Sequence, residues 1–362
     1  MKHNSTDSSE TSPRSRLRDL GIAPGVFAPG PLNAITDVPG LLVGHATVVE
    51  GATIRTGATA ILAHGGNIFC DKVPAAIAVF NGYGKFAGST QIEELGEIET
   101  PVVLTNTLAT GRAIEAIHAH TLAQPGNSRV VSINAVVGET NDSRLNDIRA
   151  GRPDISEIRA AIDAASDGEV AEGAVGAGSG TVAFGLKGGI GTSSRLVPFK
   201  SGETFTVGVL VQSNYGGRLL VDGVPCSASP ATEDKDGSIV IVVATDAALC
   251  ERNLKRLAQR AFGGLARTGA ALSNGSGDYA LAFSTHESVR RAPERRASIA
   301  LMPTLPNELV SPLFEAVIEA TEEAILNSLC MAHTVEGYDA SSGKPSRVEA
   351  ISLEALARYK AR

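Results

Sequence analysis

The tripeptide Asp236-Gly237-Ser238 stands directly before an uninterrupted apolar run at residues 239–244, and this junction constrains the chain more than any other feature. The run, Ile-Val-Ile-Val-Val-Ala, predicts a strand that is buried on both faces and therefore needs cover from two sides. The preceding residues 233–236 are Glu-Asp-Lys-Asp, which is typical of an accessible loop. A buried strand that begins at a serine directly after such a loop has two interpretations.

The first interpretation is a hairpin turn, because Asp-Gly before a strand is a common turn signal, and the local sequence alone favours it. The second is cleavage of the Gly237–Ser238 peptide bond, which would give Ser238 both a hydroxyl nucleophile and an α-amine. Such an amine has an unperturbed pKa of about 7.7–8.0 and can accept the proton of its own hydroxyl near neutral pH. Gly237 tolerates strained dihedral angles and leaves its carbonyl open to attack.

Composition removes several classes of function. The chain has 362 residues, of which 43% are hydrophobic, and its formal net charge is −7. That length suffices for one large or two modest domains with a substantial core. Because no stripe of lysine and arginine is present, a nucleic-acid partner is not expected. No apolar run has the roughly 18–20 residues of a membrane helix, so we expect no membrane partner and a cytoplasmic location.

The first 27 residues differ in composition from the rest of the chain. Residues 1–27 are rich in Ser, Thr and Arg and contain no apolar segment. This composition predicts a disordered tail and excludes a secretory signal. No internal linker or repeat follows, so we expect a single domain over residues 28–362.

The chain carries no recognisable metal or cofactor motif. Its four cysteines form no C-x-x-C pair, and its seven histidines include no H-E-x-x-H. The G-x-G-x-x-A sequence at residues 82–87 lacks the acidic residue that dinucleotide binding needs about 20 positions later. The glycine-rich stretch 173–191 lacks the G-K-[S/T] end of a phosphate loop. We therefore expect no cofactor and no metal.

Hydrophobic periodicity predicts strands and helices in alternation over most of the chain. Apolar strands of this kind are typical of sheets covered by helices. The predicted strands cover residues 58–63, 74–80, 101–105, 130–137, 205–211, 239–244 and 279–283. The predicted helices cover residues 109–122, 156–166 and 308–330, and one more segment that ends near 266 with Thr245-Asp246 as its N-cap.

Polar residues beside the apolar strands are candidates for chemistry. Asn214 stands at the end of a predicted strand, where its amide can face a developing oxyanion. Ser276 and Asp278 are two residues apart, so in an extended segment they point the same way and can orient an N-terminal amine. Glu139 follows another strand, and its carboxylate can hold a cationic substrate group. Taken alone, the Asn214 segment and the Ser276 segment are more typical of ordinary turns, and the charges around Glu139 are typical of a solvated loop.

Together these segments resemble the self-processing L-aminopeptidase/D-esterase and β-peptidyl aminopeptidase family. The matching blocks run in family order across nearly all of residues 30–340, and D-G-S-I-V and K-G-G-I-G-T are the most specific. Further blocks are I-T-D-V-P-G-L at 35–41, N-G-Y-G-K at 81–85, G-E-T-N-D at 138–142, Q-S-N-Y-G at 212–216 and N-G-S-G-D at 274–278.

The resemblance implies an α/β fold, namely a four-layer αββα sandwich like that of the N-terminal nucleophile hydrolases but with different strand connectivity. It implies self-cleavage into an α chain (28–237) and a β chain (238–362), and a homo-oligomer of these αβ units, a tetramer of heterodimers. The implied enzyme is a serine aminopeptidase, amidase or esterase. It would release small N-terminal L-, D- or β-amino residues from short peptides, amides or esters.

The resemblance also implies a role for each candidate residue. Ser238 is the nucleophile, and Asn214 supplies the oxyanion amide. Ser276 and Asp278 orient and polarise the Ser238 amine, although the family often has a Glu, one methylene longer, in place of this Asp. Glu139 binds the free amine of the substrate.

Arg144 is a departure from the family pattern. Members with strong aminopeptidase activity carry a tyrosine there, which helps to stabilise the oxyanion. Arg144 could supply charge instead, or could narrow the specificity towards acidic or amidated substrates, so we include it among the substrate-binding candidates.

Two alternatives stay open at this stage. Acetyl-ornithine transferases share a similar sandwich but cleave themselves before a threonine, so the serine at position 238 argues against that class. A non-catalytic relative is the other alternative, and Arg144 is the feature that keeps it open.

Overall fold

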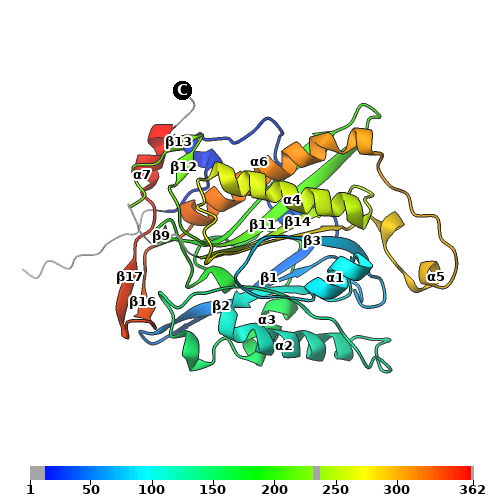
Figure 1. The fold of residues 1–362 in the computed structure, drawn as a ribbon, viewed down its shortest axis with the longest axis horizontal. Helices are drawn as coiled ribbons and strands as arrows, with labels where there is room; N and C mark the ends of the chain where they lie inside the picture. The colour runs from blue at the N-terminus through cyan, green and yellow to red at the C-terminus, as the bar shows by residue number, and fades with distance from the viewer. Residues whose placement is uncertain (1–12, 231–236, 360–362) are drawn as a thin grey trace, which may run out of the picture.

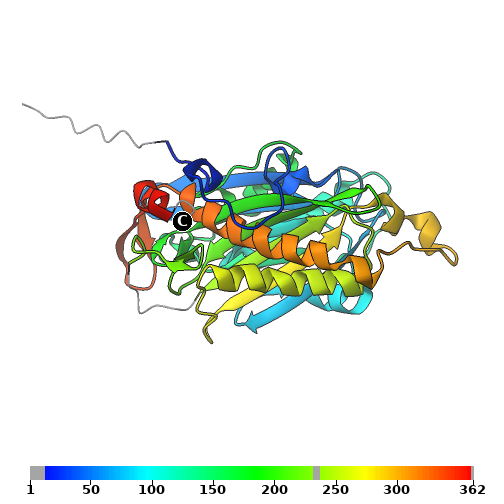
Figure 2. The same ribbon diagram turned by 90° about the horizontal axis from the view of Figure 1, so that it is seen from above.

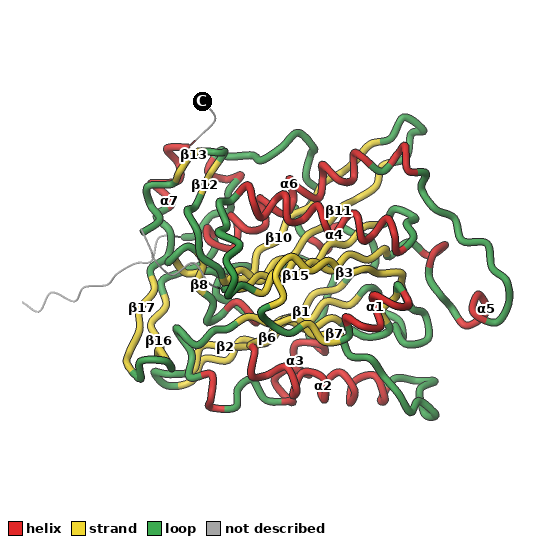
Figure 3. The backbone as a smooth tube through the Cα atoms, in the orientation of Figure 1, coloured by secondary structure: helices red, strands yellow, loops and turns green. Residues whose placement is uncertain are grey.

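Two β-sheets pack face to face between two outer layers of helices (Figure 1). The computed structural model describes residues 13–230 and 237–359. Figure 3 shows the strands as two inner layers with the long helices outside them. The predicted four-layer αββα sandwich is therefore confirmed.

The first sheet has six strands, and β14 lies inside it between β11 and β15. All eight residues of β14 are buried, as its continuous apolar sequence predicts. The pair β14 and β15 is parallel, and the other neighbours are antiparallel. In spatial order the strands are β10 (Gly189–Pro198), β11 (Thr204–Asn214), β14 (Ser238–Thr245), β15 (Gly277–Ser284), β3 (Val73–Gly82) and β5 (Glu97–Ile98).

The second sheet has five strands, and its only parallel pair is β6 with β7. In spatial order the strands are β1 (Leu42–Glu50), β2 (Ile54–Leu62), β6 (Val102–Asn106), β7 (Val136–Thr140) and β4 (Phe86–Ala87). Three two-stranded pairs complete the described strands. These pairs are β8 (Val182–Ala183) with β9 (Leu186–Lys187), β12 (Leu220–Val221) with β13 (Val224–Pro225), and β16 (Val335–Asp339) with β17 (Lys344–Val348).

Helices cover the outer face of each sheet. The pair α4 and α6 lies side by side on the six-stranded sheet, as Figure 2 shows from above, and α2 and α3 cover the five-stranded sheet. Helix α5 lies on a loop that extends away from the sandwich (Figure 1). The helices are α1 (Ser89–Leu95), α2 (Thr110–Ala123), α3 (Ile155–Asp163), α4 (Glu251–Arg267), α5 (Pro293–Arg296), α6 (Ser311–Cys330) and α7 (Leu353–Leu356).

Three hydrophobic clusters fill the three interfaces between the four layers. Strand β14 contributes to two of them, because its side chains alternate between its two faces. Ile241 packs with α4 and α6, whereas Val242 packs between the sheets. The third cluster, which includes Ile117 and Ile158, lies between the five-stranded sheet and its helices. Both faces of β14 are closely packed, so a one-residue slip would move every side chain into a space shaped for a different one, and the packing therefore fixes the register of this strand.

Close approach of α6 to β10 requires a glycine. A Cβ atom at Gly191 would lie 1.9 Å from the carbonyl oxygen of Ala324, a backbone atom of α6. No side chain fits at that distance, so the glycine allows the helix to pack directly on the strand.

A buried network of charges joins α6 to β10. The Arg195 side chain is fully buried and donates to Glu319 Oε2 at 3.2 Å and Glu323 Oε2 at 2.7 Å. Glu319 Oε1 accepts the Val26 N–H at 2.8 Å, and Glu323 Oε1 accepts the Arg18 Nε–H at 2.9 Å. The network therefore also fastens the N-terminal segment to the sandwich.

The disordered tail expected over residues 1–27 is wrong for residues 13–27, and residues 1–12 lie outside the described part. Leu17 has no exposed surface, and Arg14 donates to the carbonyls of Cys330 and Ile351. The composition predicted disorder because sequence patterns do not show the partners of these arginines. Arg14 binds a carbonyl of α6, and Arg18 binds a buried carboxylate of the same helix.

Two predicted element boundaries also differ from the structure. The strand expected over 130–137 covers only Val136–Thr140, and Val131 is almost fully exposed because this end of the segment pairs with no strand. Helix α4 begins at Glu251, not after Thr245-Asp246. Asp246 instead accepts the Thr206 N–H at 2.7 Å, so it binds the neighbouring strand. Within the described ranges, no helix combines the length and apolar character needed to cross a membrane.

The Arg195 network supplies a test of stability. We expect Arg195→Met to lower the free energy of unfolding by about 3–5 kcal/mol, because it leaves buried carboxylates without their cation. Urea denaturation measures this loss. Arg347→Met is the matched control, since Arg347 forms only exposed ion pairs with Glu336 and Glu349. Equal midpoints for the two variants would contradict the proposed importance of the network.

Candidate active site

Strand register places two residues of the predicted site, Ser238 and Asn214, side by side, with Gly277 next to them. Ser238 is the first residue of β14, Asn214 is the last residue of β11, and Gly277 is the first residue of β15. Ser238 pairs with Asn214 on one side and with Gly277 on the other. Ser238 is buried, with 7% of its surface exposed. The apolar core thus brings a serine, an amide and a backbone N–H to one edge of the sheet.

The junction before Ser238 is not a hairpin turn between paired strands. The preceding described strand, β13, pairs with β12, whereas β14 pairs with β11 and β15. The polar run 233–236 lies outside the described residues. The local turn interpretation therefore gives way to a chain that enters the middle of a sheet.

Gly237 occupies a backbone position that only glycine fits. Its φ is +156°, and a Cβ atom there would lie 2.3 Å from the Asn214 carbonyl oxygen. The Gly237 carbonyl oxygen accepts the Gly277 N–H at 3.0 Å. This hydrogen bond polarises the carbonyl that would be attacked during cleavage.

The Asn214 amide is fixed by two backbone partners. Its Oδ1 accepts the Val182 N–H at 2.9 Å, and its Nδ2 donates to the Asn141 carbonyl at 3.0 Å. Because the amide oxygen can only accept and the amide nitrogen can only donate, these partners fix the positions of Oδ1 and Nδ2. Because an amide nitrogen carries two hydrogens, the second N–H of Asn214 stays available for an oxyanion.

Ser276 and Asp278 form the predicted pair. The Ser276 hydroxyl donates to Asp278 Oδ1 at 2.7 Å, and the Asn81 amide donates to Asp278 Oδ2 at 2.8 Å. Burial raises the pKa of Asp278 above its ordinary value, and the hydrogen bonds from Ser276 and Asn81 only partly offset this rise. Both oxygens of Asp278 accept hydrogen bonds, and this arrangement suits a carboxylate that orients a nearby amine.

Glu139 belongs to the other sheet, at the end of β7, and a short segment links it to Ser276. The Tyr83 N–H donates to the Ser276 carbonyl at 3.2 Å, and the Lys85 N–H donates to Glu139 Oε1 at 2.9 Å. The ammonium of Lys85 lies 3.5 Å from the same carboxylate, and this lysine side chain is 57% exposed. An exposed lysine can move aside, so the buried carboxylate is open to a substrate ammonium.

Arg144 lines a pocket of about 200 Å³ together with Asn214 and Gly237. The structure therefore brings this predicted residue to the same place as the junction and the oxyanion amide. The side chain of Arg144 is exposed.

Lys187 is a site residue that the sequence arguments missed. Its side chain is fully buried, and Nζ donates to the carbonyls of Gly178, Thr181 and Gly188 at 2.8–2.9 Å. Burial lowers the pKa of Lys187 to about 7. Three acceptors need three N–H donors, however, and only the ammonium form has three. The turn that it holds leads directly to Val182, the partner of Asn214.

Asp142 and Asn81 were also missed as supporting residues. Asp142 accepts the Thr56 hydroxyl at 2.6 Å and the Asn146 amide at 3.0 Å, and burial raises its pKa to about 6. It anchors the turn that carries Arg144. Both residues lie in the blocks N-G-Y-G-K and G-E-T-N-D, so the signal was present but did not reveal their partners.

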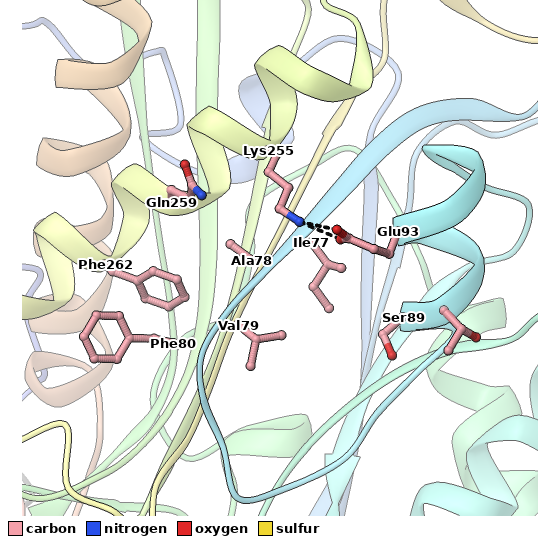
Figure 4. Close-up of a pocket in the computed structure, with 10 residues that line it drawn as sticks. Ile77, Ala78, Val79, Phe80, Ser89, Glu93, Lys255, Gln259 and Phe262 are labelled. Atoms are coloured by element: carbon pink, nitrogen blue, oxygen red, sulfur yellow. Dashed lines mark hydrogen bonds and ion pairs between the residues drawn. The ribbon is translucent and has the colours of Figure 1, made fainter.

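An apolar groove elsewhere on the surface is not the site. It lies over β3 between α1 and α4, and Figure 4 shows its lining, with Phe80 beside Phe262. Its charged pair, Lys255 and Glu93, is satisfied internally at 2.5 Å, and none of the predicted catalytic residues lines it. Among the described residues, no group of three His, Cys, Asp or Glu side chains is arranged to hold a metal ion.

Comparison with known proteins gives the same class. β-Peptidyl aminopeptidase BapA of Sphingosinicella xenopeptidilytica is 37% identical over 372 residues, which cover 95% of this chain and 90% of that protein. The β-aminopeptidase of a Burkholderia species matches with a TM-score of 0.86 at 39% identity, over 94% of this chain and 97% of that one.

The L-aminopeptidase D-Ala-esterase/amidase of Ochrobactrum anthropi matches with a TM-score of 0.83 at 35% identity, over 95% of this chain and 97% of that one. That structure is described as a prototype for the serine aminopeptidases and as a new variant among the Ntn hydrolase fold. Fold and site together thus define a hydrolase of the Ntn-type aminopeptidase class.

Residues 33–342 match the family described as Peptidase family S58, and the chain belongs to this family. The predicted family and the predicted aminopeptidase class are therefore confirmed, and the transferase alternative is not favoured. The roles of the individual residues and the self-cleavage stay predictions.

Lys187 offers a test of how the site is held. We expect Lys187→Met to lower the free energy of unfolding by about 3 kcal/mol, because three buried carbonyls lose their donor. We also expect kcat to fall more than KM changes, because Asn214 loses its fixed partner. Thermal unfolding and steady-state kinetics measure the two effects. If Lys187→Met behaves like Lys344→Met, a change at an exposed lysine, the positioning role of Lys187 is wrong.

Proposed function

We propose that the protein is a self-processing serine aminopeptidase that makes its own catalytic base by cutting the Gly237–Ser238 bond. One observation carries the proposal: the register of β14 sets Ser238 between Asn214 and Gly277. The cut would divide the domain over residues 28–362 into an α chain ending at Gly237 and a β chain beginning at Ser238.

Self-cleavage would begin with attack of the Ser238 hydroxyl oxygen on the Gly237 carbonyl carbon. The Gly277 N–H, already bonded to that carbonyl oxygen, would stabilise the negative charge that develops there. The C–N bond then breaks, the Ser238 nitrogen takes the hydroxyl proton, and an ester joins Gly237 to Ser238. Water hydrolyses this ester, which releases a Gly237 carboxylate and a free Ser238 amine.

The freed residue would then act on substrates by acyl transfer. The Ser238 amine accepts the proton of its own hydroxyl, whose oxygen attacks the substrate carbonyl. Asn214 Nδ2 stabilises the tetrahedral oxyanion, and Ser276 with Asp278 orients the amine. The leaving amine takes the proton, and water hydrolyses the acyl ester. This scheme requires neither a metal nor a cofactor.

The substrate would be a short peptide, amide or ester with a free amino terminus. Glu139 supports this class, because the only cation that pairs with its buried carboxylate among the described residues is the exposed Lys85 ammonium, which a substrate ammonium can replace. The relatives named β-peptidyl aminopeptidase and L-aminopeptidase D-Ala-esterase/amidase support small L-, D- or β-amino residues at that position.

We also propose a cytoplasmic homo-oligomer of αβ units, as the family resemblance implies. Sedimentation of the purified protein gives the mass of the assembly, and the tetramer of heterodimers is the expected result.

Intact-mass spectrometry tests the self-cleavage. Wild-type protein should give two polypeptides, residues 1–237 and 238–362, whereas Ser238→Ala should give one uncut chain without aminopeptidase activity. Ser227→Ala, at an exposed serine on the preceding loop, is the control and should be cut like wild type. An uncut wild-type chain with full activity would refute the proposal.

The pH profile tests the role of Asp278. A neighbouring carboxylate stabilises the ammonium form of the Ser238 amine and so raises its pKa, whereas catalysis needs the neutral amine. We therefore expect Asp278→Asn to reduce kcat and to move the rising limb of kcat/KM to lower pH by about one unit. Asp278→Glu, which keeps the charge, should keep the limb in place. A limb that Asp278→Asn does not move would rule out this role.

A further inference from the structure

The pocket beside the junction contains a cation without a partner. Arg144 is exposed, and among the described residues none forms a hydrogen bond or an ion pair with its guanidinium. Asn214 and Gly237 also line this pocket, and in the uncut chain none of the described residues in its lining carries a carboxylate. An unpaired guanidinium next to the reacting atoms is a binding group for an anion.

The turn that carries Arg144 is held in one conformation by hydrogen bonds and by burial of its neighbours. Asp142 is buried and accepts two side-chain hydrogen bonds, and its carbonyl accepts the N–H groups of Leu145 and Asn146 at 3.1 and 3.0 Å. Leu145 is fully buried. Arg144 thus projects from a fixed base, with buried residues on both sides of it in the sequence.

The two charged groups of the site lie in different places. Glu139, the expected anchor for the substrate ammonium, is not among the residues that line the Arg144 pocket. Ser238 and Asn214, at the paired ends of two strands, would hold the scissile carbonyl. A substrate whose amine binds Glu139 therefore has its other end free to enter the pocket.

The size of the pocket limits what can enter. About 200 Å³ is smaller than the roughly 300–1,000 Å³ of sites for drug-sized ligands, so the pocket suits one small residue. A free dipeptide has a positive charge at one end and a negative charge at the other. Its two charges match Glu139 and Arg144, whereas a longer or amidated peptide offers no carboxylate at this point.

We propose that Arg144 binds the α-carboxylate of the leaving residue and that the preferred substrates are dipeptides with a free carboxyl terminus. This proposal rests on the proposed function and adds the class of leaving group. Arginine suits the task because its planar guanidinium is always charged and can donate two parallel hydrogen bonds to a carboxylate.

The test compares two leaving groups on one acyl residue. The value of kcat/KM is measured for β-alanyl-glycine and for β-alanyl-glycinamide, with β-alanyl-p-nitroanilide as the uncharged reference. We expect wild-type enzyme to prefer the free carboxylate about tenfold, which is the lower end of what a charge-assisted hydrogen bond supplies. Arg144→Met should abolish the preference, and Arg144→Lys should restore part of it. Arg149→Met, a change at an exposed arginine that does not line the pocket, should keep it.

The outcomes separate this proposal from the one on which it rests. Wild-type protein that leaves all three substrates intact would refute the proposed function. If the anilide is hydrolysed but Arg144→Met leaves the ratio of carboxylate to amide unchanged, only the present proposal falls. That result would leave the new Gly237 carboxylate as the partner of Arg144. An equal loss on all three substrates would also overturn it, because Arg144 would then act on the oxyanion.

Discussion

The pairing of β14 with β11 and β15 is the constraint on which the rest of the site depends. Its side chains alternate between the helix-covered face and the face that meets the second sheet, so both hydrophobic clusters hold the strand in one register. That register sets Ser238 level with Asn214 and Gly277. The position of Ser238 is thus determined by core packing over the length of the strand, and not by the loop before it.

Buried polar groups around this edge make the surroundings rigid. Lys187 donates hydrogen bonds to three backbone carbonyls around one turn. Asp142 accepts hydrogen bonds that fix the turn carrying Arg144, and the Asn81 amide donates to Asp278. Each of these groups is costly to bury without partners, and each has them. In the same way, the N-terminal segment donates hydrogen bonds to the buried carboxylates of Glu319 and Glu323 on α6. Hydrogen bonds and ion pairs thus fix the positions of the turns, whereas apolar packing fixes the positions of the strands.

The sequence predicted the strands and the long helices because their signals are local, whereas the roles of the catalytic candidates rest on the family resemblance. The run at 239–244 is apolar throughout, which is a strand signal by itself. The spacing of Ser276 and Asp278 predicts only that the two side chains point the same way in an extended segment. Lys187 and Arg14 could not be interpreted in this way, because their partners are backbone carbonyls distant in sequence or set by turns. Residues 130–135 include several apolar residues, but no described strand pairs with them. Sequence alone cannot show this, because it depends on how the strands are arranged.

In the proposed mechanism, Ser238 serves as both nucleophile and base. The state of the Ser238 nitrogen therefore tests the mechanism directly. In active protein labelled with ¹⁵N-serine, NMR should show a terminal amine nitrogen at Ser238. Its titration midpoint should coincide with the rising limb of kcat/KM. A Ser238 nitrogen that remains a peptide amide in fully active protein would contradict the account.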